Sequence, residues 1–321
     1  MLPTYASIGV AAPVLLCLLR FAQGIGLGGE WGGAALIATE NAPAHRKTWF
    51  GMFPQLGAVL GFLMANGIFL LMVTWLGETE FRAWGWRVPF VLSLVLLAVG
   101  MYVRMSLHES EAFTRVQQRK AIHALPMTVL LSKHAGAVAR GALAMMVSYA
   151  LFNIATVFMM GHATNALGMS RETVLLIQCG TVGFMGLGIV LASQLSDRLG
   201  RNRVLLVACL LGAPAGLLLT PALNSGTPWA IASWLAVALF ATGLSFGPMG
   251  AHLPQAFPAD VRYSGASLAY NLGGILGASA VPWLAQHLVS SGGPSLLSAY
   301  VMVAALVSAA ALWRERPNHP D

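Results

Sequence analysis

Apolar residues occur along this chain in long runs that short polar segments separate. The runs cover roughly 12–39, 50–75, 87–105, 137–161, 172–195, 203–221, 228–251, 264–289 and 295–313. Each is long enough to cross a bilayer as a helix, which needs about 20 residues. None alternates with period two, as the strands of a membrane β-barrel do. Backbone groups in lipid must be satisfied within their own segment, so the pattern predicts nine membrane-spanning helices in an all-α membrane protein.

Composition supports this prediction and excludes other classes. Hydrophobic residues make up 57% of the 321 residues and charged residues only 9%, whereas soluble domains carry about 25% charged residues. A soluble enzyme, a nucleic-acid-binding protein and a disordered chain are therefore excluded. The net charge of +7 follows from the basic loops of a membrane protein, and the expected partner is the lipid bilayer rather than nucleic acid.

Basic residues are concentrated on one side of the predicted membrane. Fourteen of the 18 Lys and Arg residues lie in or at the edges of one set of loops, and three lie in the other set. The first set comprises 40–49, 105–136, 196–203, 252–263 and 314–321. The positive-inside rule places it in the cytoplasm, with the C-terminus, and places residues 1–11 outside the inner membrane. Because no signal-peptide pattern precedes the first run, we expect an odd number of helices to be missing before it.

The first run contains both a glycine stripe and two charges. Gly24, Gly28 and Gly32 recur every four residues and would let another helix approach closely. Arg20 and Glu30 are costly inside a span, so we expect partners for them in the bundle interior. They are ten residues apart, about 15 Å along a helix, and cannot pair directly with each other. The alternative is that Arg20 extends outward and Glu30 stabilises a helix contact.

Two later segments carry further signals. Asp197, Arg198, Gly200 and Arg201 lie between the fifth and sixth runs. They suit a cytoplasmic gate in which the carboxylate is held by a neighbouring helix N-terminus or by an Arg. The dipeptide 247–248 is Gly-Pro and predicts a break in the seventh run, as in transporter helices that line a cavity.

These motifs together resemble the metabolite:proton symporter family of the major facilitator superfamily, which carries shikimate, 2-oxoglutarate, citrate, and proline or betaine. The resemblance rests on the stretches 20–33, 84–90, 108–113, 197–201 and 257–267. It implies a major facilitator fold of twelve helices, of which the nine runs would be helices 4–12. It also implies an incomplete N-terminal half at 1–104, a cytoplasmic linker at 105–136 and a six-helix C-terminal half at 137–321.

The resemblance implies proton-coupled symport of a carboxylate or zwitterion by a monomer, driven by the proton gradient without a cofactor or metal. Arg20 is either the counter-charge of the substrate or part of proton coupling. Glu30 is the first candidate for carrying the proton, and His252 is the second. Gln255 stands where an acidic residue is expected, which argues against a charge pair there. The other candidate substrate-binding residues are polar groups at mid-span depth: Gln23, Gln55, Tyr149, Asn153, Tyr270 and Asn271.

Two alternatives remain beside the carrier. A membrane enzyme or channel would need a catalytic, metal-binding or selectivity motif, and the sequence has no HExxH, GxSxG or Walker A pattern. The second alternative is an N-terminally truncated remnant that transports nothing, because the first three helices of the fold are expected and not seen.

Overall fold

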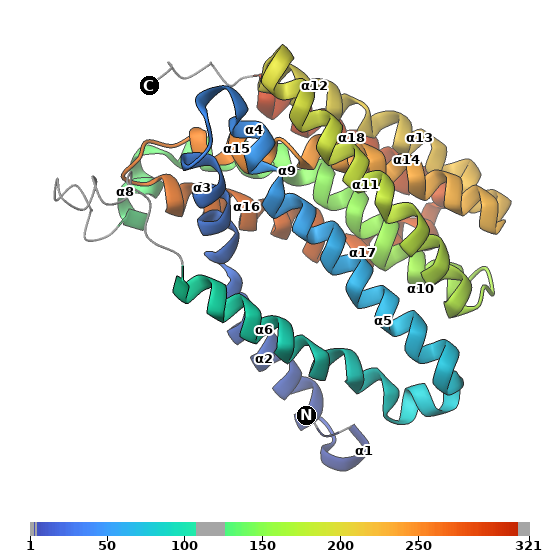
Figure 1. Cartoon of the computed structure of the whole chain (residues 1–321). Coiled ribbons are helices and arrows are strands. Elements are labelled where there is room, and N and C mark those ends of the chain that lie inside the picture. Colours follow the sequence, from blue (N-terminus) through green and yellow to red (C-terminus); the bar gives the residue numbers. More distant parts are fainter. Residues whose placement is uncertain (1–2, 4, 107–125, 314–321) are drawn as a thin grey trace.

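The computed structural model describes residue 3 and residues 5–106 and 126–313, and all regular elements in this part of the chain are helical (Figure 1). Nine stretches of the described chain are long and apolar enough to cross a membrane, and we number them spans 1–9. They are Ala11–Glu40, Ala44–Gly77, Gly85–Val103, Ala135–Asn165, Arg171–Leu199, Arg201–Ser225, Pro228–Gln255, Arg262–Gly292 and Pro294–Trp313. The predicted runs overlap every span and differ only by a turn or two at their ends. The expected all-α membrane fold is confirmed.

Several spans consist of more than one helix. Span 1 comprises α2 (Ala11–Leu27) and α3 (Glu30–Glu40), span 2 comprises α4 (Lys47–Gly51) and α5 (Phe53–Ala83), and span 3 is α6 (Val88–Ser106). Spans 4 to 6 are built from α9 (Ala135–Asn153), η3 (Ile154–Phe158), α10 (Met159–Asn165), α11 (Arg171–Leu199), α12 (Arg201–Leu210) and α13 (Gly212–Ser225). Spans 7 to 9 are built from α14 (Pro228–Phe246), α15 (Met249–Gln255), α16 (Arg262–Gly274), η4 (Ile275–Ser279), α17 (Val281–Gly292) and α18 (Pro294–Trp313). The short helices η1 (Ala44–Arg46) and η2 (Gly85–Arg87) begin spans 2 and 3, and α1 (Tyr5–Ile8) and α8 (Pro126–Lys133) lie outside the spans.

Local sequence signals set the helix ends. The Ser170 side chain accepts a hydrogen bond from the Thr173 backbone N–H and caps α11. Thr227 caps α14 in the same way, ahead of a proline at the first helical position. Gly200 ends α11 with a φ of 92°, a conformation that residues with a Cβ rarely adopt. These signals let spans 5 to 7 turn sharply outside the bilayer.

The break predicted in span 7 is present. Helix α14 ends at Phe246, and α15 begins at Met249 after Gly247 and Pro248. Proline has no backbone N–H and cannot continue the hydrogen-bond ladder of the helix before it. The break therefore leaves backbone carbonyl groups in the middle of the bundle open to other partners.

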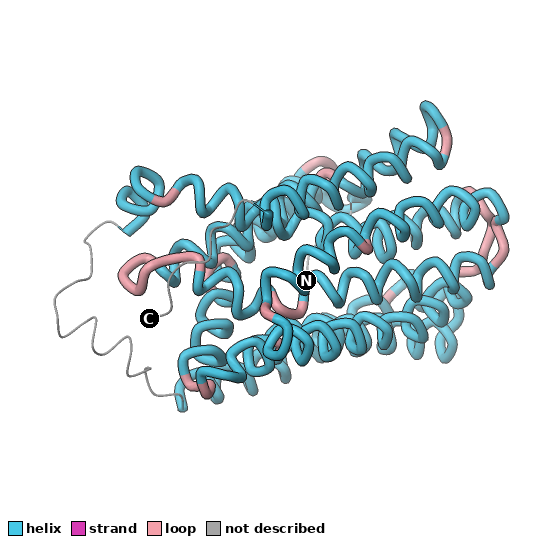
Figure 2. The backbone as a smooth tube through the Cα atoms, turned by 90° about the horizontal axis from the view of Figure 1, so that it is seen from above, coloured by secondary structure: helices cyan, strands magenta, loops and turns pink. Residues whose placement is uncertain are grey.

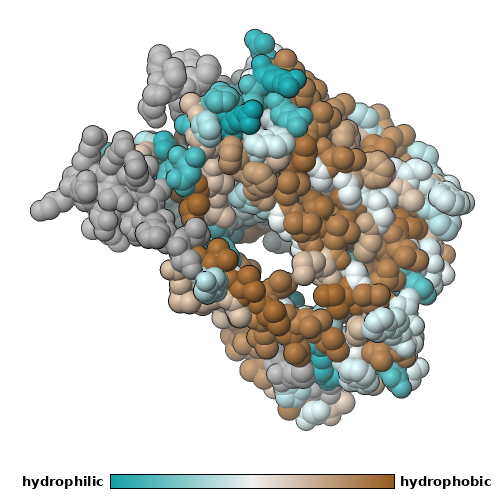
Figure 3. All heavy atoms as spheres, in the orientation of Figure 1, coloured by the Kyte–Doolittle hydropathy of each residue, from teal (hydrophilic) through white to brown (hydrophobic). Residues whose placement is uncertain are grey.

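The hydrophobic core lies in spans 4–9, which we call the C-terminal six spans. Seen from above, the helices of the described residues run side by side in roughly one direction (Figure 2). In span 7, 67% of the most apolar stretch is buried inside the protein. The most apolar stretches of spans 1 and 3 have no buried residues. Many apolar side chains of spans 1 and 3 therefore face outward, whereas span 2 buries Met52 and Val59 in the core. Spans 1–3 are called the N-terminal three spans, and Figure 3 shows apolar residues on this side of the molecule.

The N-terminal three spans meet the C-terminal six mainly at one end. Helices α3 and α4 pack there against α11, α15 and α16, and α5 continues from this end along α11. Helices α2 and α6 stand away from the bundle (Figure 1). We call this the basic end, because the loops 40–49, 196–203 and 252–263 gather there. Figure 3, in the orientation of Figure 1, shows an opening above α6, between this helix and the helices that lie above it in the view. Residues 107–125 of the predicted linker lie outside the described residues.

The basic end is expected to face the cytoplasm. A green fluorescent protein fused after Asp321 should fluoresce, and alkaline phosphatase inserted at Gly226, between spans 6 and 7, should be active because that loop is then periplasmic. The measurement is fluorescence and phosphatase activity in whole cells. The reverse pattern of the two reporters would contradict the orientation.

Candidate functional site

One carboxylate fastens the start of span 2 to the end of span 5. Asp197 accepts hydrogen bonds from the backbone N–H groups of Thr48, at 3.2 Å, and Trp49, at 3.0 Å. These N–H groups belong to the first turn of α4, where backbone donors lack partners within the helix and the helix dipole favours a negative charge. A hydrogen bond to a charged group contributes about 1.5–3 kcal/mol. Of the two partners expected for Asp197, the structure therefore has the helix N-terminus.

Asp197 lies inside the last turn of α11, not after the helix as the sequence suggested. Arg198 beside it is exposed. Arg201 donates to the Gln255 side-chain oxygen at 2.6 Å. The neutral residue at position 255 is thus still engaged by a cation, through its amide oxygen in place of a carboxylate.

An ion pair joins spans 1 and 8 at the same basic end. An Arg262 guanidinium nitrogen lies 3.9 Å from a Glu40 carboxylate oxygen, and both side chains are about four-fifths buried, with relative exposures of 23% and 19%. Sequence analysis did not single out this pair. Glu40 follows the first run and Arg262 precedes the eighth. The only sequence signal for the pair was that opposite charges occur in these two loops.

Glycines close the seam between spans 1 and 8. A Cβ on Gly29 would collide with the Tyr263 hydroxyl, and one on Gly32 would collide with the Ser267 hydroxyl. Asn271 donates its side-chain amide to the Gly28 carbonyl at 2.7 Å. The predicted close approach of a second helix is confirmed for this part of the stripe.

The remainder of the stripe does not make such contacts. A Cβ on Gly24 would meet no atom within 4 Å. Gly24 lies on α2, which stands away from the bundle, whereas the glycines from position 28 onward lie where span 1 turns into α3 and reaches α16.

Four aromatic side chains from four spans meet just inside this seam. Trp31 of span 1 stacks on Tyr270 of span 8 with ring centroids 3.9 Å apart and planes inclined by 8°. Tyr149 of span 4 meets Tyr270 edge-on at 5.5 Å, and Phe246 of span 7 lies 6.3 Å from Tyr149. We call these four residues the aromatic cluster. Tyr149 and Tyr270 were expected at mid-span depth, whereas Trp31 and Phe246 were missed because their rotation about the helix axis decides the contact.

Other predicted polar residues serve the helices that carry them. The Asn153 amide donates to the Tyr149 carbonyl one turn earlier in the same helix. His252 is buried in α15, with 5% exposure. Gln55 is also buried and links the aromatic cluster to span 7.

The charges of span 1 lie in a different place from the one expected. Arg20 is exposed and donates to Gln23, at 3.0 Å, one turn further along α2. Glu30 is exposed at the start of α3. The expected position in the bundle interior is therefore not found: Arg20 lies on α2, which stands away from the C-terminal six spans, and Glu30 is exposed at the first residue of α3.

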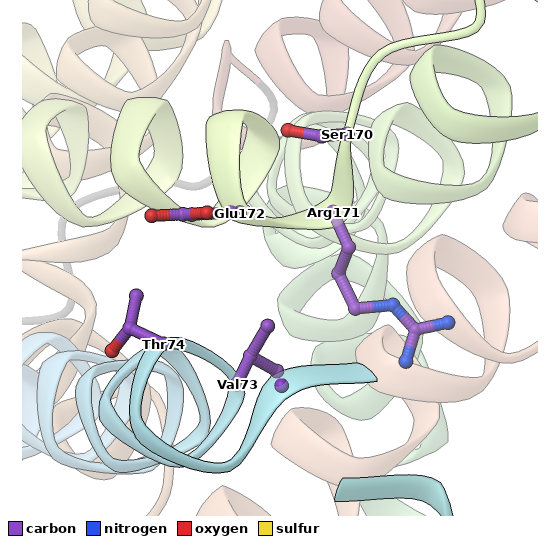
Figure 4. Close-up of a pocket in the computed structure, with 6 residues that line it drawn as sticks. Val73, Thr74, Ser170, Arg171 and Glu172 are labelled. Atoms are coloured by element: carbon purple, nitrogen blue, oxygen red, sulfur yellow. The ribbon is translucent and has the colours of Figure 1, made fainter. Parts of the chain in front are cut away.

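A separate pocket of about 350 Å³ lies between the end of α5 and the start of α11 (Figure 4). It is lined by Val73, Thr74, Gly77, Ser170, Arg171 and Glu172. None of the predicted site residues lines it, and it lies at the opposite end of span 5 from Asp197. In the described residues, no group of His, Cys, Asp and Glu side chains has the arrangement of a metal site.

Comparison with known proteins gives consistent results along nearly the whole chain. The profile of the Major Facilitator Superfamily matches residues 1–266 and again 141–321. The inner membrane metabolite transport protein YhjE of Escherichia coli K12 is 45% identical over 97% of this chain and 72% of its own length. The shikimate transporter of Escherichia coli K12 is 31% identical over 96% of this chain and 72% of its own.

A proline/betaine transporter of Salmonella typhimurium is 30% identical over 96% of this chain and 63% of its own. All three relatives are transporters by name, which agrees with the expectation of a protein that is not an enzyme. The matches give no support to the alternative of a remnant that transports nothing.

The seam predicts different outcomes for two glycines of the same stripe. Gly32→Val should lower the free energy of unfolding by about 1–3 kcal/mol, because the added atoms overlap α16. Gly24→Val is the matched control and should leave stability almost unchanged, since its surroundings are open. Thermal unfolding of the purified protein in detergent measures both. Equal shifts in the two variants would contradict the assigned seam.

Proposed function

The chain belongs to the Major Facilitator Superfamily of membrane transporters, and from this premise we propose that it is a secondary carrier. It moves a small organic acid or zwitterion together with protons across the inner membrane, with its C-terminus in the cytoplasm. Transport follows alternating access, in which two groups of helices rock around a central site. The proton gradient is the driving force, no cofactor takes part, and one chain is the working unit.

The observation that carries this proposal is the set of polar contacts that joins the two groups of spans at the basic end. At the basic end, Asp197 and the pair Glu40–Arg262 join spans from both groups through polar contacts. Away from it, α2 and α6 stand apart from the bundle (Figure 1). Polar contacts between rigid groups can break and reform without unfolding either group. This is the kind of reversible contact that a rocking carrier needs at its cytoplasmic face.

The aromatic cluster and Arg20 supply chemistry for a carboxylate or zwitterion. A guanidinium binds a carboxylate through two parallel hydrogen bonds. Aromatic faces attract cationic groups and pack against ring-shaped ones. Arg20 is exposed on α2, and Trp31 and Tyr270 are half-buried at the seam. The names of the relatives, shikimate and proline/betaine transporters, describe substrates of this chemistry.

Glu30 is the proposed proton carrier, with His252 as the second candidate. Glu30 is exposed in this structure, at the bend between α2 and α3. Closing the opening in the other half of the cycle would remove water from the carboxylate. Because burial disfavours the charged form, the carboxylate would then bind a proton. Protonation and closure would thereby be coupled.

Uptake by cells that express the protein tests the proposal. Labelled shikimate, 2-oxoglutarate and betaine are offered separately at pH 6, and accumulation above the vector control is expected for one of them. A protonophore should abolish that accumulation because it dissipates the gradient. Accumulation that persists in the presence of the protonophore and depends on a sodium gradient would contradict proton coupling.

A substitution at Glu30 tests its role. Glu30→Gln keeps the shape and removes the titrating group, so accumulation against a gradient should fall at least tenfold while exchange of labelled for unlabelled substrate continues. Glu172→Gln, at the far end of the protein, is the control and should accumulate normally. Unchanged gradient-driven accumulation in Glu30→Gln would show that Glu30 is not the proton carrier.

A further inference from the structure

Gln55 of span 2 connects Trp31, in the N-terminal three spans, to span 7 in the C-terminal six. Its side-chain oxygen accepts a hydrogen bond from the indole N–H of Trp31 at 2.8 Å. Its side-chain nitrogen donates to the Phe246 backbone carbonyl at 2.9 Å. Gln55 is 1% exposed. One amide thus joins span 1 and span 2 to span 7 inside the apolar part of the protein.

The acceptor on span 7 is available because of the helix break. Phe246 is the last residue of α14, and Gly247 and Pro248 separate it from α15. Carbonyl groups at the end of a helix lack partners in the ladder and must be satisfied from elsewhere. A buried carbonyl without a partner costs about 1–3 kcal/mol. Gln55 satisfies the Phe246 carbonyl from the other group of spans.

The hydrogen bond to Phe246 depends on contact between two backbones one helical turn away. A Cβ on Gly250 would collide with the Gly51 carbonyl, and a Cβ on Gly51 would lie 2.9 Å from the Ala251 backbone nitrogen. Gly51 precedes Gln55 by four residues on the same span. If these backbones separate, the short Gln55 side chain cannot follow, and the bond to span 7 breaks.

Trp31 adds a second link. The same indole that donates to Gln55 stacks on Tyr270. A substrate that inserts between the two rings must displace the indole, which shifts or breaks its hydrogen bond with Gln55. Substrate binding at the aromatic cluster and closure of the basic end therefore both change the hydrogen bonds of the Gln55 amide.

We propose that Gln55 is a positioning residue that holds the basic end closed until Trp31 moves, and that it does not bind the substrate directly. This inference rests on the proposed function, since it assigns Gln55 a place in the transport cycle. It replaces the role expected from the sequence, in which Gln55 was one of several candidate substrate ligands.

Cysteine labelling tests the closure without any knowledge of the substrate. Thr48→Cys places a thiol at a position of the closed basic end that is 3% exposed, in a background where Cys17, Cys179 and Cys209 are replaced by serine. Labelling by N-ethylmaleimide in native membranes should be slow. Adding Gln55→Leu should speed labelling about tenfold, since loss of one buried hydrogen bond shifts the equilibrium by about that factor.

The chain offers a matched control. Gln178 is another buried glutamine, and its side-chain nitrogen donates to the carbonyl groups of Ala155 and Thr156 within the C-terminal six spans. Gln178→Leu removes comparable hydrogen bonds that do not cross between the two groups, so labelling of the thiol introduced at position 48 should stay slow. Gln55→Asn, which keeps the amide but shortens its reach, should behave as Gln55→Leu does and covers the case in which leucine prevents folding.

Equal labelling rates in the Gln55 and Gln178 variants would overturn the inference. So would a Gln55→Asn variant whose uptake KM rises while the introduced thiol stays protected, because that result makes Gln55 a substrate ligand. Failure of the proposed function gives a different result, in which no substrate accumulates while the labelling difference persists.

Discussion

The structure depends on two backbone N–H groups at the start of α4, whose hydrogen bonds Asp197 accepts. The C-terminal six spans have their own buried core, whereas spans 1 and 3 bury almost none of their apolar surface in the protein. Lipid is as apolar as the helix faces, so hydrophobic burial does not draw the two groups together. Polar contacts and close backbone packing must do so. They are concentrated at the basic end, where Asp197 acts together with the Glu40–Arg262 pair.

The contacts at the basic end are of three kinds. Charged groups meet at Asp197 and in the Glu40–Arg262 pair, glycine backbones pack closely against α16 and α15, and Gln55 joins Trp31 to span 7. An unpaired charge costs far more inside a protein or a bilayer than at the surface. The charged contacts can therefore exchange with water if this end opens, while the buried amide depends on neighbouring groups.

Much of this arrangement could be predicted from the sequence, for reasons that are local. The nine spans follow from the requirement that lipid-embedded backbone be helical, and the break at 247–248 follows from the chemistry of proline. For Asp197 the sequence left two partners open, a neighbouring helix N-terminus or an Arg, and the structure has the first. The positions of Arg20 and Glu30 were predicted wrongly. The cost of burying a charge indicates that a buried charge needs a partner, but it does not show whether the helix that carries the charge lies in the bundle interior. Trp31 and Phe246 were missed because contacts among four helices depend on their relative rotation.

The backbone contact between spans 2 and 7 has a consequence for how such a chain can diversify. Where Gly51 meets Gly250, main-chain atoms touch main-chain atoms, and the identity of the surrounding side chains has little influence on the fit. The residues that select the substrate can therefore vary while this contact stays the same. On the proposed function, substitutions around Trp31 and Tyr270 would change the specificity and leave the contact that closes the basic end intact.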